Sequence, residues 1–188
     1  MVLYNWEVVT KHACLLGDGP VWDSRKNRIF WIDVLRGEIH YMRTDNNQHN
    51  TCKLGKIIGA IAFKKSGGII AAIKGGFATV DILKGTVQIV AKVETNLPDN
   101  RFNDGKCDPA GRFWAWTMST LNKPHAGSVY VLEKDFTVNT KKLFKNSCHY
   151  FVRLQKWPVG IPLVNGTTAL RRGWCPHQPR YGGAKSYF

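Results

Sequence analysis

The stretch Asp108-Pro-Ala-Gly-Arg-Phe-Trp-Ala-Trp116 begins with the residues of a β-turn and continues as an apolar run with the composition of a strand. Two earlier segments have the same order of polar turn and apolar run, Asp23-Ser-Arg-Lys-Asn-Arg-Ile-Phe-Trp-Ile32 and Lys64-Lys-Ser-Gly-Gly-Ile-Ile-Ala-Ala-Ile73. The three apolar runs begin at positions 28, 68 and 112, which are 40 and 44 residues apart. The chain therefore repeats a unit of nearly constant length.

Each unit contains further short strands. A second apolar stretch follows each run and is entered through a glycine, at Gly37, Gly76 and Gly127, and residues 59–63 and 86–90 add two more short apolar segments. Short strands in units of about 40–45 residues are typical of β-propeller blades, which have about four strands each. A β-sandwich is the alternative because its turns also recur every 8–12 residues or so, but it does not explain the repeated unit length.

The number of units limits the architecture. A closed propeller needs at least about four blades, and only about three units precede the end of the pattern. We expect an all-β fold in which residues 1–138 form a β-propeller truncated to about three antiparallel blades and not closed into a ring.

The composition changes near residue 138. Residues 136–188 contain nine Lys or Arg, no Asp or Glu and four of the eight prolines, and so contribute +9 of the net charge of +14. They show no long period-2 or period-3.6 pattern. We therefore expect residues 139–188 to be an irregular basic tail, as an alternative or out-of-frame ending would produce. A basic arm for nucleic acid or an anionic membrane is the other interpretation, although its cations are scattered and not clustered.

Two sequence features bear on location. No window approaches 18 consecutive apolar residues, so we expect no membrane span, and the N-terminus has no basic segment followed by an apolar one, so we expect no signal peptide. The five cysteines are scattered and form neither a disulfide framework nor a CxxC pair. These features favour a reducing, cytoplasmic location.

Two polar motifs carry a resemblance to a known family. Leu16-Gly-Asp-Gly-Pro-Val-Trp-Asp23 lies in the first unit, and Arg101-Phe-Asn-Asp-Gly-Lys106 directly precedes the turn at Asp108. With the strands around them, these motifs resemble the regucalcin/gluconolactonase/luciferin-regenerating enzyme family over about residues 4–138. The resemblance implies a six-bladed propeller that opens lactone rings with one divalent cation bound on the propeller axis.

The resemblance also implies roles for three residues. The acidic metal ligand of the family falls on Asp18, and the substrate-contacting Arg and Asn fall on Arg101 and Asn103. A hard cation such as Ca²⁺, Mg²⁺ or Mn²⁺, or alternatively Zn²⁺, accepts carboxylate oxygen. The fork of an arginine can donate two hydrogen bonds to a polyhydroxylated substrate, and an asparagine can both donate and accept. Beyond the metal ligand, no catalytic residue can be assigned.

The sequence departs from the family pattern at several points. Asp18 stands where the family has Glu, and Trp116 stands where it has Gly. The second ligand, an Asn, has no counterpart soon after position 138, and no acid follows Asp135 to serve as the third. Only one of three ligands can be assigned, so we expect weak cation binding.

Each assigned residue has a simpler interpretation. Asp18 could shape a turn beside Gly and Pro, Arg101 could pair with Asp99 or Asp104, and residues 103–104 could form an Asx-turn into Gly105. The tryptophans at positions 22, 31, 114 and 116 are expected to lie in the core or between blades. None of the six histidines has the spacing of a metal motif.

Two functions remain open. The first is a metal-dependent lactone hydrolase of the gluconolactonase type, weak or inactive because the second half of its metal site is missing. The second is a non-catalytic truncated isoform or binding protein whose basic tail contacts anionic partners. A small lactone is the expected ligand in the first case, and nucleic acid is not favoured in the second.

Overall fold

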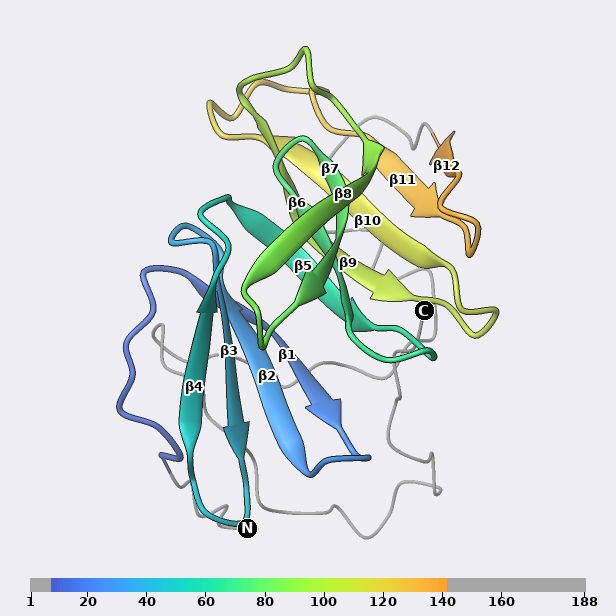
Figure 1. The fold of residues 1–188 in the computed structure, drawn as a ribbon. Helices are drawn as coiled ribbons and strands as arrows, with labels where there is room; N and C mark the ends of the chain where they lie inside the picture. The colour runs from blue at the N-terminus through green and yellow to red at the C-terminus, as the bar shows by residue number, and fades with distance from the viewer. Residues whose placement is uncertain (1–7, 142–188) are drawn as a thin grey trace, which may run out of the picture.

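A computed structural model describes residues 8–141 and arranges them as three four-stranded antiparallel sheets (Figure 1). In each sheet the strands follow chain order, so that every strand pairs with the one before it and the one after it. Sheet 1 contains β1 (Gly17–Asp23), β2 (Arg28–Asp33), β3 (Glu38–Arg43) and β4 (His49–Lys53). Sheet 2 contains β5 (Ile58–Phe63), β6 (Ile69–Ile73), β7 (Gly76–Asp81) and β8 (Thr86–Lys92). Sheet 3 contains β9 (Asn100–Cys107), β10 (Phe113–Ser119), β11 (Val129–Leu132) and β12 (Val138–Lys141).

This architecture confirms the all-β prediction and the repeated unit. The three apolar runs that define the repeat are β2, β6 and β10, the second strand of each sheet, and the runs entered through glycine are β3, β7 and β11. The β-turn predicted at Asp108 is present, because the Gly111 N–H donates to the Asp108 carbonyl at 2.9 Å. The six-blade count and the truncation remain predictions. Apart from 139–141, which belong to β12, the predicted basic tail lies outside the described residues.

The core consists of apolar layers between neighbouring sheets. Alternate residues of β6 face opposite sides, which is the period-2 arrangement of a strand: Ile69, Ala71 and Ile73 pack toward sheet 1, and Ile70 and Ala72 pack toward sheet 3. All five are buried. Sheet 2 is therefore covered on both faces, which explains the uninterrupted apolar sequence of β6.

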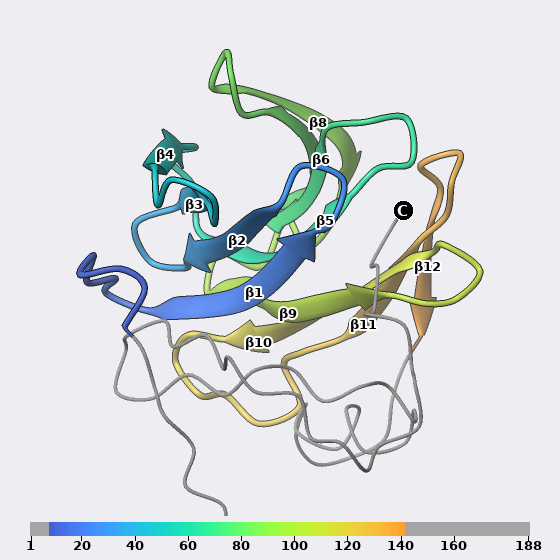
Figure 2. The same cartoon turned by 90° about the horizontal axis from the view of Figure 1, so that it is seen from below.

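The first strands of the three sheets lie side by side. β5 contacts both β1 and β9, and Figure 2 shows the three strands near the middle of the view, with β4, β8 and β12 at the outside. Each of them is interrupted near its beginning by a β-bulge: at Gly19 and Pro20 in β1, at Gly59 in β5 and at Asn103 in β9. A bulge bends its strand and redirects a side chain, so the same local irregularity occurs three times where the sheets meet.

The prediction for the tryptophans was correct only in part. Trp31 and Trp116 are buried and Trp114 is partly buried, whereas Trp22 is 44% exposed, contrary to the expectation that it lies in the core or between blades. Trp22 stands on β1 between Val21, which packs against the core, and the buried Asp23, so its side chain points to the opposite side of the strand. Among the described residues, no helix is long and apolar enough to cross a membrane.

Candidate functional site

Asp18 lies on β1 immediately before the bulge. Its backbone pairs with Ile32 of β2, and its Oδ1 accepts a hydrogen bond of 2.7 Å from the N–H of Gly19. Gly19 has a φ of 58°, a left-handed conformation that glycine adopts without strain. The carboxylate therefore does help to shape the bulge, as the simpler interpretation proposed. The hydrogen bond uses one oxygen and is compatible with a ligand role for the other.

Arg101 and Asn103 lie on β9, on either side of a core residue. Phe102 is buried between sheets 2 and 3, so Arg101, which precedes the bulge, points to the opposite side of the strand, away from the core. Arg101 and Asn103 are both partly buried. Asn103 is the extra residue of the bulge, since Phe102 pairs with Thr117 and Asp104 pairs with Trp116. The bulge thus places both Asn103 and Asp104 opposite Trp116, at the inner edge of sheet 3 and directly after Arg101 and Phe102.

Asp18 lies near this group although it is far away in the sequence. Burial lowers the pKa of the Arg101 guanidinium, and the charge of Asp18 acts in the opposite direction. Burial raises the pKa of Asp104 to about 6, and the Asp18 charge adds to the increase, whereas a 2.6 Å hydrogen bond from the Gly105 N–H opposes it. Two carboxyl groups and one guanidinium from β1 and β9 therefore share a partly desolvated region.

The simpler interpretations of Arg101 and Asn103 are not supported. Among the described residues, Arg101 makes no ion pair; it donates a 2.9 Å hydrogen bond to the carbonyl of Phe102. Asp99 pairs with Lys123 at 2.8 Å instead. An Asx-turn at 103–104 is absent, because the Asp104 carboxylate accepts from the next residue and not from the one after it.

A carboxylate that the sequence analysis missed holds the beginning of β9. Glu94, in the loop after β8, accepts hydrogen bonds from Asn100 Nδ2 at 3.0 Å, Thr117 Oγ1 at 2.9 Å and the Tyr130 hydroxyl at 2.9 Å. Burial, and then the bond and charge of Glu94, raise the pKa of Tyr130 to about 12. The loop is thereby joined to β9, β10 and β11, directly before Arg101. No local pattern marks this isolated Glu in the sequence.

The inner strands offer only part of the ligand set for a divalent cation. Such an ion takes about six or more oxygen ligands, several of them from the protein. In residues 8–141, no group of three His, Cys, Asp or Glu ligands occurs at this position, and the carboxyl groups present are those of Asp18 and Asp104. These residues therefore do not form a complete cation site.

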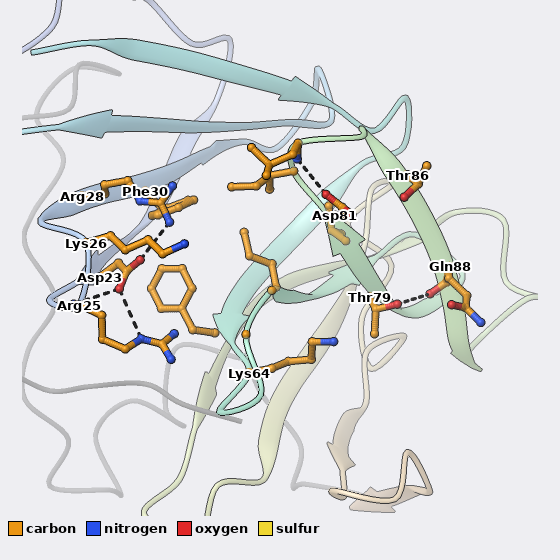
Figure 3. Close-up of a pocket in the computed structure, with 17 residues that line it drawn as sticks. Asp23, Arg25, Lys26, Arg28, Phe30, Lys64, Thr79, Asp81, Thr86 and Gln88 are labelled. Atoms are coloured by element: carbon orange, nitrogen blue, oxygen red, sulfur yellow. Dashed lines mark hydrogen bonds and ion pairs between the residues drawn. The ribbon is translucent and has the colours of Figure 1, made fainter.

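A groove with a volume of about 640 Å³ lies elsewhere, between sheets 1 and 2 (Figure 3). Its rim carries Arg25, Lys26, Arg28 and Lys64 together with Asp23 and Asp81. Arg28 pairs with Asp23 at 3.1 Å, and the Arg28 guanidinium also lies 5.0 Å from the centre of the Phe30 ring. The basic rim is thus partly neutralised, and none of the residues predicted for the site lines this groove.

A second cluster of polar side chains lies on the other face of sheet 1. His12, Cys14 and His40 meet there. Burial, and then the neighbouring His12 and His49, lower the pKa of His40 to about 4, so its imidazole is uncharged at neutral pH. Spacing along the chain did not indicate this cluster.

Comparison with known proteins supports the resemblance. A family model described as the SMP-30/Gluconolactonase/LRE-like region matches residues 16–149. Regucalcin from Danio rerio is 34% identical over 134 residues, which cover 70% of this chain and 45% of that protein. 6-Deoxy-6-sulfogluconolactonase from Pseudomonas putida is 33% identical over 110 residues, which cover 58% of this chain and 38% of that protein.

A solved structure agrees with the fold. The crystal structure of a calcium-binding protein, regucalcin from Agrobacterium tumefaciens, superposes with a TM-score of 0.69 at 27% identity, and the match covers 73% of this chain and 46% of that one. The chain thus spans less than half the length of these three relatives. What the relatives bind or hydrolyse is therefore a property of longer proteins.

Proposed function

The chain belongs to the SMP-30/gluconolactonase/LRE-like family, and we propose that it carries the substrate-binding edge of a metal-dependent hydrolase for small sugar lactones. The observation that supports this most directly is the proximity of Asp18 on β1 to Arg101 on β9, two residues from separate motifs. The names of two relatives are consistent with lactone hydrolysis and cation binding: one is a 6-deoxy-6-sulfogluconolactonase and the other is described as a calcium-binding protein.

Each residue has a role that its chemistry allows. Arg101 would donate to the ring or carboxylate oxygens of the lactone and its product, because its partly buried guanidinium has no acidic partner within ion-pair distance among the described residues. The Asn103 side chain, which makes no hydrogen bond to another described residue, would donate to and accept from sugar hydroxyls. Asp18 would contribute one oxygen ligand to a divalent cation, which when bound would polarise the lactone carbonyl and activate water.

We propose that hydrolysis by the 188-residue chain alone is weak or absent. The described residues give the cation at most two carboxyl groups, and the sequence has no acid after Asp135. Each charge interaction is also several times weaker in water than in an enclosed site. We place the reaction in the cytoplasm, where the free thiols at positions 14, 52 and 107 would be preserved.

The test measures binding and turnover separately. Gluconate, the stable product, is titrated into the 188-residue chain and followed by NMR line broadening. Acid release from gluconolactone is measured with Ca²⁺, Mg²⁺, Mn²⁺ or Zn²⁺ against a heat-denatured blank. We expect gluconate binding that Arg101→Ala and Asn103→Ala each weaken roughly tenfold, as the loss of one charge-assisted or neutral hydrogen bond predicts. Any metal-dependent turnover should disappear in Asp18→Ala.

Arg43→Ala is the matched control. Arg43 is an exposed arginine at the end of β3 whose side chain pairs with Asp45, so its removal should leave gluconate binding unchanged. Equal binding by the wild type, Arg101→Ala and Arg43→Ala would contradict the proposed role of the inner edge. Full metal-dependent turnover by the wild type would show instead that residues outside the described part complete the site.

A further inference from the structure

Sheet 1 has a buried polar row on the face that points away from sheet 2. The register aligns Trp31 of β2, His40 of β3 and Thr51 of β4 across the sheet. His49 lies two residues before Thr51 on β4, hence on the same face. His40 is completely buried there. Burying an imidazole is unfavourable unless its nitrogens have hydrogen-bond or metal partners. The buried His40 ring therefore needs partners for both of its nitrogens.

The segment before β1 covers this row and brings two more ligand groups to it. Figure 1 shows this segment running alongside sheet 1. The ring centroid of His12 lies 4.4 Å from that of His40 and 5.0 Å from that of His49. One ligand atom each from His12, Cys14 and His40 falls within 4.8 Å of the other two. The three residues come from two separate parts of the chain.

The covering segment is held in place on both sides of Cys14. The N–H of Leu15 donates to Asp33 Oδ2 at 2.7 Å, and the Arg36 guanidinium donates to the carbonyl of Ala13 at 2.9 Å. Arg36 also donates to Asp33 at 3.1 Å, which ties the two anchors together. The thiol is therefore positioned by its neighbours and does not depend on a metal for its location.

The hydrogen-bonding capacity of the two imidazole rings is only partly used. The Nε2 atoms of His12 and His40 are both buried and accept or donate no hydrogen bond to a described residue. The other nitrogen of His40, Nδ1, lies 3.1 Å from Thr51 Oγ1 and 3.2 Å from His49 Nε2. When Nδ1 donates its proton to Thr51 Oγ1, Nε2 keeps a free lone pair, which is the arrangement that supports metal-ligating histidines.

We propose that His12, Cys14 and His40 form a binding site for Zn²⁺, separate from the inner strands and from the lactone site. Two imidazole nitrogens and one thiolate are ligands that Zn²⁺ prefers, whereas Ca²⁺ and Mg²⁺ prefer oxygen. Glu38 Oε2 lies 3.4 Å from His40 Nε2 without forming a hydrogen bond, and its negative charge would offset that of the ion. A water molecule would complete the four-coordinate arrangement that is usual for Zn²⁺. On binding, the Cys14 proton is released to solvent and the thiolate sulfur coordinates the ion.

The bound ion would join the N-terminal segment to β3 across the face of sheet 1. Because Zn²⁺ binds the folded arrangement and not the unfolded chain, it should raise the thermal midpoint of the 188-residue chain by roughly 5 °C or more at saturation. The site thus acts as a structural clamp on a face that sheet 2 does not cover.

The test titrates Co²⁺, a spectroscopic substitute for Zn²⁺, into the chelator-treated 188-residue chain. We expect a thiolate-to-cobalt charge-transfer band and the intense visible bands of four-coordinate Co²⁺, both removed by one equivalent of Zn²⁺. Cys14→Ser should abolish the charge-transfer band. His12→Asn should weaken Co²⁺ binding at least tenfold, because even the loss of a residue that only hydrogen-bonds to a metal ligand has an effect of about this size. Neither change should alter the unfolding midpoint without metal by more than a few degrees, because both residues lie in the covering segment.

A double variant serves as the control, because two of the other four cysteines, Cys148 and Cys175, lie outside the described residues. The chain with Cys148→Ser and Cys175→Ser should keep the full spectrum and affinity. Loss of the charge-transfer band in this double variant, or an unchanged spectrum in Cys14→Ser, would overturn the proposal. Absence of any stoichiometric Co²⁺ complex in the folded wild type would overturn it as well. These readouts are independent of lactone binding, so they remain valid whether or not the proposed function is correct.

Discussion

Removing the Glu94 carboxylate should destabilise the fold at the point where it holds the beginning of β9. The carboxylate accepts from three side chains, on β9, β10 and β11. Glu94→Ala leaves all three donors without this acceptor. A hydrogen bond to a charged group contributes about 1.5–3 kcal/mol, but this site is only partly buried and water can replace part of the loss. At about 1 kcal/mol per donor, the free energy of unfolding should fall by roughly 3 kcal/mol.

Urea unfolding followed by tryptophan fluorescence measures the change. With an m-value of about 2 kcal/mol per molar urea, a loss of this size lowers the midpoint by roughly 1–2 M. Glu94→Gln separates charge from shape. Its Oε1 still accepts from Thr117 and Tyr130, but its amide group faces the amide of Asn100, so we expect a loss of about 1–2 kcal/mol.

Glu133→Ala provides the comparison. Glu133 accepts only a long, exposed bond of 3.4 Å from Asn139 among the side-chain contacts of the described residues, so its removal should cost less than about 0.5 kcal/mol. If Glu94→Ala were no more destabilising than Glu133→Ala, the reasoning that Glu94 anchors β9 would be refuted.

Three further predictions concern single positions, each measured by the urea midpoint. Gly59→Ala should lower the free energy of unfolding by about 1–3 kcal/mol, because the added Cβ would lie 2.5 Å from the backbone of Phe102. This loss should exceed that of Gly67→Ala, where the Cβ meets open space and only the positive φ of 93° is unfavourable. Asp104→Asn should raise the free energy of unfolding at pH 7.5 by about 1–3 kcal/mol and have little effect at pH 4. The reason is the raised pKa of about 6: above this pH the folded chain must bury an ionised Asp104, whereas at pH 4 the carboxyl group is protonated and uncharged. Asp33 behaves in the opposite way: burial raises its pKa, but three backbone N–H donors lower it by more, so Asp33→Asn should be costly at pH 7 and progressively less so as the pH falls below the unfolded value of 3.8.

The repeat could be predicted from the sequence because each unit contains the residues typical of a turn followed by those typical of a strand. Polar turn residues and glycines mark where a strand begins, and these signals are local. The bulges were not predicted, because a single extra residue such as Asn103 leaves no trace in a pattern of short strands. The exposure of Trp22 was missed because an apolar residue in a strand was expected in the core, whereas the alternation places its side chain opposite those of Val21 and Asp23.

The candidate site was predictable only as far as its motifs reach. Asp18, Arg101 and Asn103 were assigned through the family resemblance, and their grouping in space depends on β5, which lies between the strands that carry them. Glu94, His12 and Cys14 lie outside any motif, and no metal-like spacing marks His40. Their partners are distant in the sequence, and a contact between separate elements cannot be derived from local spacing.

The three bulges explain why the candidate site draws its groups from sheets 1 and 3 and not from sheet 2. They occupy corresponding places in the three first strands, so the fold offers three similar positions at its inner end. At the middle position the residue is Gly59, and a side chain there would collide with the backbone of Phe102 at 2.5 Å. The close approach of β5 to β9 therefore leaves no room for a functional side chain at this position of the middle strand. The residue directly before the bulge, which is Asp18 in β1, is Ile58 in β5, and its side chain is buried in the core. Sheet 2 thus offers no carboxylate at the place where sheet 1 has one.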